Sequence, residues 1–398
     1  MNFFNSKNKK TFFQYSFLSA VSFIFYKTYT KNSKCNKLMA LENKEDKTLQ
    51  EIKDNNSASK DREVGITKKL ESMIQDTLPF QCKEIINLGI KHTNPVEGSR
   101  IIAKNKSNYN SCSENLKSYL KLNGFKDKEK FEKENLLVMK NFLVLMSNII
   151  NHYFEEISVE VNRNLDEFNF VSTMSPQERK EVSTQLINKL KELEKNVFID
   201  KSENGNGYYK GNFFGINKKF LDYPNKFLLY KEAGVYNDWP KDRVVYKNKG
   251  ISVIINDDDH VKFRLNHTPG SANSDDKEAP DVKISDKLLY FLDILDLFEK
   301  QNKVSFHNDF GYLNTNVLNS GHGMNFYLKL KIKDNDEKLT KIAKKMEEFA
   351  QSNSQYYNYD FQKIEKSDEC NLIISNSSSY GGLLPALFEI VQLKDEFK

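Results

Sequence analysis

The sequence contains little arginine. Only six of its 60 basic residues are arginines, and these are Arg62, Arg100, Arg163, Arg179, Arg243 and Arg264. The planar guanidinium grips phosphate oxygens in pairs, whereas the lysine ammonium is a point charge. Any site that clamps phosphate groups in this way has few arginines available. The formal net charge is only +5 over 398 residues, and this small, evenly spread charge predicts no binding to nucleic acid.

Cysteine and histidine are also few, and their spacing suggests no cluster. The four cysteines, which form no C-x-x-C pair, are Cys35, Cys82, Cys112 and Cys370. We therefore predict neither a zinc site nor a disulfide framework, and we favour a reducing compartment. The aspartates at 257–259 lack the spacing of a calcium loop, so no metal site is expected.

The amino-terminal segment has no acidic residue before Glu42. Residues 11–26 carry no charge and lie between Lys10 and Lys27. As a helix they would span about 24 Å, a little less than a hydrocarbon core of about 30 Å, and flanking lysines and tyrosines can anchor such a short span. A membrane anchor, a cleaved secretory signal and a mitochondrial targeting segment all remain open. We favour a retained anchor in a mitochondrial protein associated with the inner membrane, with anchoring to another membrane as the alternative.

Composition and periodicity divide the chain into four segments. A hydrophobic, basic targeting or anchor segment (1–40) is followed by a polar linker (41–65). Helical periodicity over 66–153 predicts a small all-α domain. Strand-like alternation mixed with helices over 154–398 predicts an α+β domain. The expected strands include 244–246, 251–255, 261–265 and 326–332, and the expected helices include 136–150, 176–193 and 285–301.

Three stretches concentrate the candidate functional residues. They are N-D-W-P-K-D-R-V-V-Y-K-N-K-G-I-S-V-I-I-N-D-D-D-H-V-K-F-R (237–264), V-S-F-H-N-D-F-G-Y-L-N-T-N-V-L-N-S-G-H-G-M-N-F-Y-L-K-L (304–330) and I-I-S-N-S-S-S-Y-G-G-L (373–383). Their order and spacing resemble the phosphagen (guanidino) kinases, the arginine and creatine kinase family, with its W-P-x-G-R turn, N-E-E-D-H-L-R motif and F-G-[FY]-L-T-x-C-P-T-N segment. The resemblance extends over about 66–398 and includes F-Q-C-K-E-I-I-N-L-G-I-K-H-T-N-P (80–95). It implies a guanidino-kinase-like larger domain, with an antiparallel sheet flanked by helices.

The resemblance also implies positions for the guanidine substrate. The family joins a guanidine nitrogen to the γ-phosphate of ATP, using carboxylates and a cysteine at the guanidine and arginines around the phosphates. Asp257 and Asp258 stand at the carboxylate positions, and Asp258 replaces a glutamate with a side chain one methylene shorter. Asn316 stands at the reactive cysteine. The same aspartate run also makes an ordinary hairpin turn.

The nucleotide positions implied by the resemblance have lost their arginines and histidines. They carry Glu160, Asn162, Lys226, Lys262, Asn325 and Lys329. One preorganised donor aimed at transition-state charge contributes about 3–4 kcal/mol, and such groups act as a unit. Glu160 also adds negative charge beside the expected phosphates. We therefore expect no ATP or ADP binding, no cofactor and no active catalytic residue.

These observations predict a catalytically inactive phosphagen-kinase-like protein. We expect a structural or accessory subunit of a membrane-associated, mitochondrial complex, with other protein subunits as partners and residues 11–26 at the membrane. The alternative is a divergent, active ATP:guanidino phosphotransferase or protein-arginine kinase in which lysines replace arginines. A third possibility is a regulatory module that binds a nucleotide or guanidino compound through Asp257 and Asp258 without chemistry.

Overall fold

The computed structural model describes the parts of the chain that build one compact unit, Ser59–Lys398. The described residues are 68–72, 78–92, 100–123, 125, 130–133, 135–197, 218–219, 228–239, 241–248, 251–267, 283–333, 344–345, 348, 357–363, 369–376, 380 and 382–392. The predicted anchor at 11–26, the linker at 41–65 and Lys226 lie outside them. Within the described ranges no helix is both long and apolar enough to cross a membrane.

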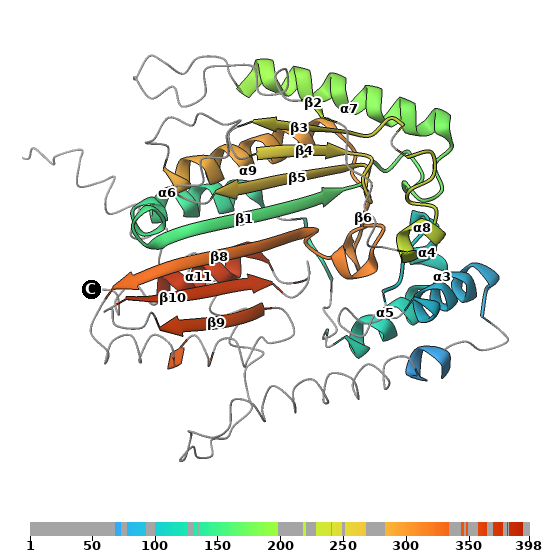
Figure 1. Ribbon diagram of the computed structural model, residues 1–398, viewed down its shortest axis with the longest axis horizontal. Helices are drawn as coiled ribbons and strands as arrows, with labels where there is room; N and C mark the ends of the chain where they lie inside the picture. Colours follow the sequence, from blue (N-terminus) through green and yellow to red (C-terminus); the bar gives the residue numbers. More distant parts are fainter. Residues whose placement is uncertain are drawn as a thin grey trace, which may run out of the picture. The chain divides into compact units, whose positions relative to one another are not determined.

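An eight-stranded sheet forms the centre of the fold (Figure 1), in the order β2-β3-β4-β5-β1-β8-β10-β9. Its strands are β1 (Phe154–Arg163), β2 (Lys218–Lys219), β3 (Val244–Asn248), β4 (Ile251–Ile255), β5 (Val261–His267), β8 (Met324–Lys333), β9 (Tyr357–Lys363) and β10 (Glu369–Asn376). Every neighbouring pair is antiparallel. A separate hairpin joins β6 (Phe306–His307) to β7 (Gly311–Tyr312). The expected antiparallel sheet is confirmed, and the four expected strands lie within β3, β4, β5 and β8.

The two faces of this sheet differ because successive side chains of a strand point to opposite sides. One face is apolar and buried, with Val159, Val161, Phe263, Leu265 and Leu328. Helices α6 (Leu136–Tyr153), α9 (Ile284–Gln301) and α11 (Leu383–Gln392) pack against it and lie behind the sheet in Figure 1. The opposite face carries Glu160, Asn162, Lys262, Arg264 and Asn325 at matching registers of β1, β5 and β8. The candidate site lies on this polar face.

The helices that support the sheet follow their sequence signals. On α6 the methionines Met139 and Met146 are buried in the core, as the helical stripe predicts. Helix α7 (Pro176–Val197) begins with a capping box. The backbone N–H of Glu178 donates to Ser175 Oγ at 3.2 Å, and the N–H of Ser175 donates to Glu178 Oε2 at 2.8 Å. The helix runs to Val197, beyond the expected end at about 193.

A second apolar cluster is built by the small helical part of the chain. Its helices are α3 (Phe80–Lys91), α4 (Lys106–Ser111) and α5 (Ser113–Leu122). A disulfide joins Cys82 to Cys112, whose Cα atoms lie 5.6 Å apart. The prediction of no disulfide framework is therefore wrong for this pair, because helix packing brings together two cysteines separated by 30 residues.

The same cluster takes in residues of the loop between β7 and β8. Leu313 and Val317 of this loop are buried in it, as is Phe310 of the turn between β6 and β7. The short helix η2 (Val317–Asn319) lies in the loop between β7 and β8. Two backbone hydrogen bonds also link this loop to the helical part. The N–H of Ala103 donates to the carbonyl of Thr315 at 2.8 Å, and the N–H of Val317 donates to the carbonyl of Ile101 at 3.1 Å. This loop therefore connects the helical part to the end of the central strands where the candidate site lies.

Candidate functional site

The aspartate run forms the turn between β4 and β5. Asn256 begins the turn with φ of +55°, a left-handed conformation that asparagine tolerates better than most residues. Its N–H donates to the carbonyl of His260 at 2.9 Å, and its side chain donates to the carbonyls of Arg179 and Asp242, both at 3.0 Å. The segment is thus a well-tied hairpin turn, and it also places three carboxylates at one end of the polar face.

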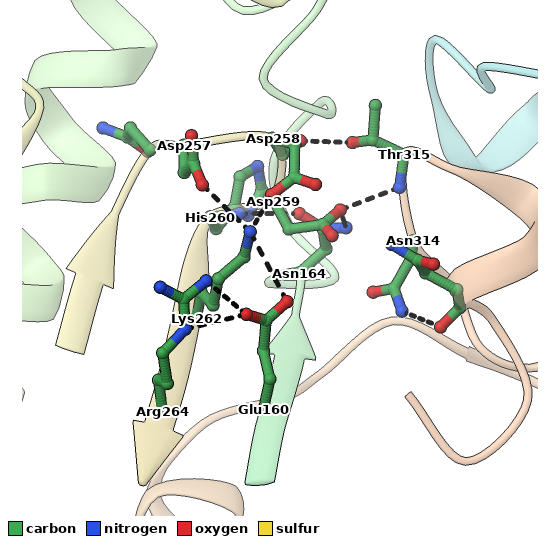
Figure 2. A network of polar contacts seen from close by, with 12 residues as sticks. Glu160, Asn164, Asp257, Asp258, Asp259, His260, Lys262, Arg264, Asn314 and Thr315 are labelled. Atoms are coloured by element: carbon green, nitrogen blue, oxygen red, sulfur yellow. Dashed lines mark hydrogen bonds and ion pairs between the residues drawn. The ribbon is translucent and has the colours of Figure 1, made fainter. Parts of the chain in front are cut away.

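Lys262 is the centre of the site (Figure 2). Its Nζ lies 2.9 Å from Asp257 Oδ2, 2.9 Å from Asp258 Oδ1 and 3.6 Å from Glu160 Oε1. The side chain is only 9% exposed. Burial alone would lower the pKa of this ammonium, but the three carboxylates more than offset burial and hold the pKa of Lys262 well above its ordinary value. The two aspartates at the implied guanidine positions are therefore already paired with a cation of the chain itself.

The second cation of the site is paired in the same way. Arg264 lies opposite Glu160 in the β1–β5 register, and its Nε donates to Glu160 Oε2 at 2.9 Å, with Nη2 on the same oxygen. Glu160 thus bridges Arg264 and Lys262. The sequence analysis did not identify Arg264 as a site residue, and the pairing follows only from the strand register.

Asp259 points away from this cluster, toward the buried polar groups of Asn164 and Thr315. Its Oδ1 accepts the side-chain N–H of Asn164 at 2.6 Å and the backbone N–H of Thr315 at 2.7 Å, while no hydrogen bond to Oδ2 is found among the described residues. Burial and the charge of Asp258 raise the pKa of Asp259 to about 7, although the two N–H donors oppose the shift. This carboxyl connects the turn to the loop between β7 and β8, and neither Asn164 nor Thr315 carries a signal in the sequence that would have identified it.

His260 is held as a neutral ring. Its Nδ1 accepts the backbone N–H of Leu165 at 2.9 Å, so the proton is on Nε2, which donates to the carbonyl of Asn169 at 2.7 Å. Burial lowers the pKa of His260 to about 4. Both nitrogens are engaged with backbone, and the ring has a structural role here rather than that of a base near neutral pH.

The structure brings some of the predicted nucleotide positions together. Asn162 lies opposite Lys262, and Asn325 lies opposite Glu160. Lys329 stands four residues further along β8, where its Nζ pairs with Glu155 Oε2 at 2.6 Å. It therefore does not join the Lys262 cluster, and Lys226 lies outside the described residues.

Asn316, at the implied cysteine position, is buried, and its side chain is already hydrogen-bonded within the loop. Its side-chain oxygen accepts the N–H of Leu318 at 3.1 Å and caps η2. Its backbone forms a bridge to Ile102 in the helical part. Asn316 therefore stabilises the loop, and an amide lacks the thiolate chemistry of a cysteine.

Three more arginines are fully buried and bound within the fold: Arg163, Arg179 and Arg243. Each donates to backbone carbonyls, and Arg163 also pairs with Glu299 and stacks 3.5 Å from the centre of the Tyr312 ring. Burial lowers the pKa of Arg243 to about 10. Together with Arg264, which is paired to Glu160, these arginines are committed to contacts within the chain.

A known family matches part of the larger domain. Residues 215–353 match the family described as ATP:guanido phosphotransferase, C-terminal catalytic domain. This segment contains the turn at 256–260, β5 and the loop between β7 and β8, whereas Glu160 and Asn162 on β1 precede it. No curated protein matches the chain in sequence.

Solved structures show the same fold. The substrate-free duplicated taurocyamine kinase from Schistosoma mansoni aligns over 88% of this chain and 48% of its own length, with a TM-score of 0.54 and 18% identity. The same kinase with bound transition state analog components aligns over 88% and 47%, with a TM-score of 0.51 and 17% identity. The chain thus spans about half the length of that duplicated kinase.

Proposed function

Because this chain belongs to the phosphagen kinase family through its C-terminal catalytic domain, we propose that it is a member without phosphotransferase activity that acts as an accessory protein. One observation carries the proposal. Three cations on the polar face, Lys262, Arg264 and Lys329, are each ion-paired with a carboxylate of the same chain.

The charge balance disfavours a nucleotide. Three carboxylates face two cations in the Lys262 cluster, so no net positive charge remains for the phosphates. A phosphate charge about 4 Å from Glu160 would be repelled by about 4 kcal/mol at an effective dielectric constant of 20. Phosphoryl transfer depends almost entirely on positioning and on stabilising the developing charge, and the neutral side chains of Asn162 and Asn325 cannot supply it.

The carboxylates at the implied guanidine positions are also already paired within the chain. Asp257 and Asp258 would have to release Lys262 before they could hold a substrate cation. Breaking a buried ion pair by removing one partner costs about 3–5 kcal/mol. Electrostatics in this chain therefore oppose the binding of both substrates of the family reaction, the nucleotide and the guanidino compound.

The accessory role rests on the fold and on the amino-terminal sequence. The apolar core and the joint between the helical part and the sheet are intact, so the chain keeps a stable body for docking while its site is neutralised. We propose that residues 11–26 attach this body to a membrane, the mitochondrial inner membrane being the first candidate, and that other protein subunits are its partners. Such a use of a kinase fold is an inference by analogy.

A turnover assay tests the inactivity. The purified full chain is incubated with MgATP and arginine, creatine, taurocyamine or lombricine, beside an active phosphagen kinase. We expect no phosphorylated guanidino product from this chain. Turnover with any of the four would establish the alternative, a divergent active phosphotransferase.

A separate assay tests the accessory role. Native membranes are extracted with mild detergent, and the intact mass of the chain and its co-purifying proteins are measured. We expect a chain that retains residues 11–26 and elutes with defined partner subunits. A soluble, monomeric chain without that segment would contradict the membrane and subunit roles while leaving the inactivity untouched.

A further inference from the structure

Helix α6 presents an apolar stripe to solvent. Three of the five large apolar side chains that are exposed in the described parts of the chain lie on this helix, where Leu137 is 61% exposed, Val144 57% and Leu145 42%. The other exposed residues of α6 are Asn141, Asn148 and His152. At about 100° per residue these six positions fall within one arc of about 100°, so they form a single stripe about 22 Å long.

The stripe differs from an ordinary solvent face of a helix. The exposed positions of α7 include two lysines and two glutamates, Lys180, Glu181, Lys191 and Glu192. None of the six exposed positions of α6 carries Lys, Arg, Asp or Glu, although 29% of the chain is charged. A surface helix normally carries charge opposite its buried side, whereas the centre of a protein interface is depleted in charge. The composition of this stripe is therefore that of an interface.

The stripe is complementary to itself when a second α6 runs in the opposite direction. About a two-fold axis placed between Val144 and Leu145, Val144 faces the partner's Leu145, and Asn141 faces the partner's Asn148, because each pair is equally distant from the axis. An amide both donates and accepts hydrogen bonds, so the facing asparagines satisfy each other. No like charges meet, and the positive end of each helix dipole lies beside the negative end of the other.

From this complementarity we propose that the protein forms a symmetric homodimer in which the exposed stripes of two α6 helices pack antiparallel. The inference goes beyond the proposed function and does not depend on the absence of activity. Since α6 packs against the apolar face of the sheet, the dimer leaves the polar face uncovered. A membrane surface fits the stripe less well, because helices that lie on membranes combine apolar residues with lysines and arginines.

Sedimentation of the full-length chain in mild detergent measures the dimer. We expect a Kd of about 10 µM, because a single pair of helices lies toward the small end of specific interfaces. Val144→Lys brings two ammonium groups together near the axis and should raise the Kd at least about tenfold. Phe80→Lys changes an apolar residue of α3 that is 82% exposed, and this control should dimerise like wild type. A wild-type monomer at the highest concentration, or equal weakening by Phe80→Lys, would overturn the proposal.

Cysteine crosslinking tests the position of the axis. In a Cys35→Ser, Cys370→Ser background, the remaining native cysteines, Cys82 and Cys112, are joined in the disulfide. Leu145→Cys then adds one thiol beside the proposed axis, and mild oxidation should convert most of the protein to a covalent dimer. Absence of this covalent dimer would contradict the proposed pairing.

A thiol at the end of the stripe tests the direction of the helices. In an antiparallel pair the two copies of position 137 lie about 22 Å apart along the helices, beyond the reach of a disulfide, so Leu137→Cys alone should not crosslink. A mixture of Leu137→Cys and His152→Cys should crosslink, because these positions face each other. If Leu137→Cys alone crosslinked as readily as Leu145→Cys, the helices would be parallel and the antiparallel dimer would be refuted.

Two other occupants of the stripe would give different results. A monomer that binds vesicles of phosphatidylcholine and cardiolipin, and loses this binding in Val144→Lys, would assign the stripe to a membrane. A monomer in which Leu145→Cys crosslinks only to a different protein in a native extract would assign the stripe to another subunit. Either result would overturn the homodimer.

Discussion

The two faces of the central sheet are built from the same strands and yet serve different purposes. Phe263 and Arg264 are neighbours on β5. Phe263 is 1% exposed and packs edge-on to Phe298, with ring centres 5.0 Å apart, whereas the Arg264 side chain is 39% exposed and pairs with Glu160. The apolar face forms the core of the fold, and the polar face carries the candidate site. Charges can therefore be exchanged on one face without loss of the structure that the other face maintains.

The largest effect should come from the apolar face. Phe263→Ala removes a buried ring and leaves a cavity, which costs about 3–5 kcal/mol of unfolding free energy. Denaturant unfolding of the two proteins measures the difference. A loss below about 1 kcal/mol would show that this face is not the main source of stability.

The crosslink of the second apolar cluster should have the next largest effect. Replacing Cys82 and Cys112 together with serine removes the disulfide, which closes a separation of 30 residues, and we expect a loss of about 2–4 kcal/mol. Thermal unfolding with and without a reductant provides the measurement. Reductant should lower the Tm of the wild-type chain and leave the double variant unchanged, and the opposite pattern would contradict the crosslink.

The polar joint at the end of the site predicts a specific pH dependence. A pKa of about 7 for Asp259 means that its stabilising contribution is present below about pH 4 and is lost as the pH rises to 7. A pKa of about 4 for His260 means that its contribution is present above about pH 6.5 and is lost as the pH falls to 4. The two slopes oppose each other in the wild-type protein.

Asp259→Asn should unmask the histidine. The variant keeps the acceptor for Thr315 and Asn164, and it should lose roughly 2–3 kcal/mol more stability than wild type between pH 6.5 and 4. Denaturant titrations at several pH values measure the difference between the two proteins. Parallel curves would show that Asp259 does not titrate in this range.

The smallest effect should come from the paired charges. Arg264→Ala removes a half-exposed partner and leaves Glu160 with Lys262, so we expect a loss of no more than about 1 kcal/mol. Lys329→Ala should cost a similar amount or less. A loss above about 3 kcal/mol for Arg264→Ala would mean that the polar face contributes to stability as strongly as the apolar face.

Much of this fold could be predicted from the sequence. Alternation of apolar and polar residues predicted β3, β4, β5 and β8. The S-P-Q-E sequence predicted the start of α7, because helix capping depends on neighbouring residues. The turn of three aspartates and its neighbours gave the family resemblance that the match over 215–353 supports. Local patterns are therefore sufficient for these four strands and for the start of this helix.

The pairing of distant residues could not be predicted in the same way. The Cys82–Cys112 bond, the Arg264–Glu160 pair and the contact of Asp259 with Thr315 join residues far apart in the sequence. They depend on helix packing, strand register and loop position, and none of these produces a residue pattern at a fixed spacing in the sequence. The scarcity of arginine was visible in the sequence, but the pairing of Lys262 with the carboxylates of the site could be seen only in the fold.

The central claim is that the candidate site on the polar face cannot hold a nucleotide, because Lys262 and Arg264 are already paired with carboxylates of the chain. Calorimetric titration of MgATP into the full-length protein tests it most directly, beside an active phosphagen kinase as the positive control. The account predicts no binding heat for this chain at concentrations that saturate the control. A saturable isotherm with a Kd in the micromolar range, abolished by Lys262→Met, would contradict it.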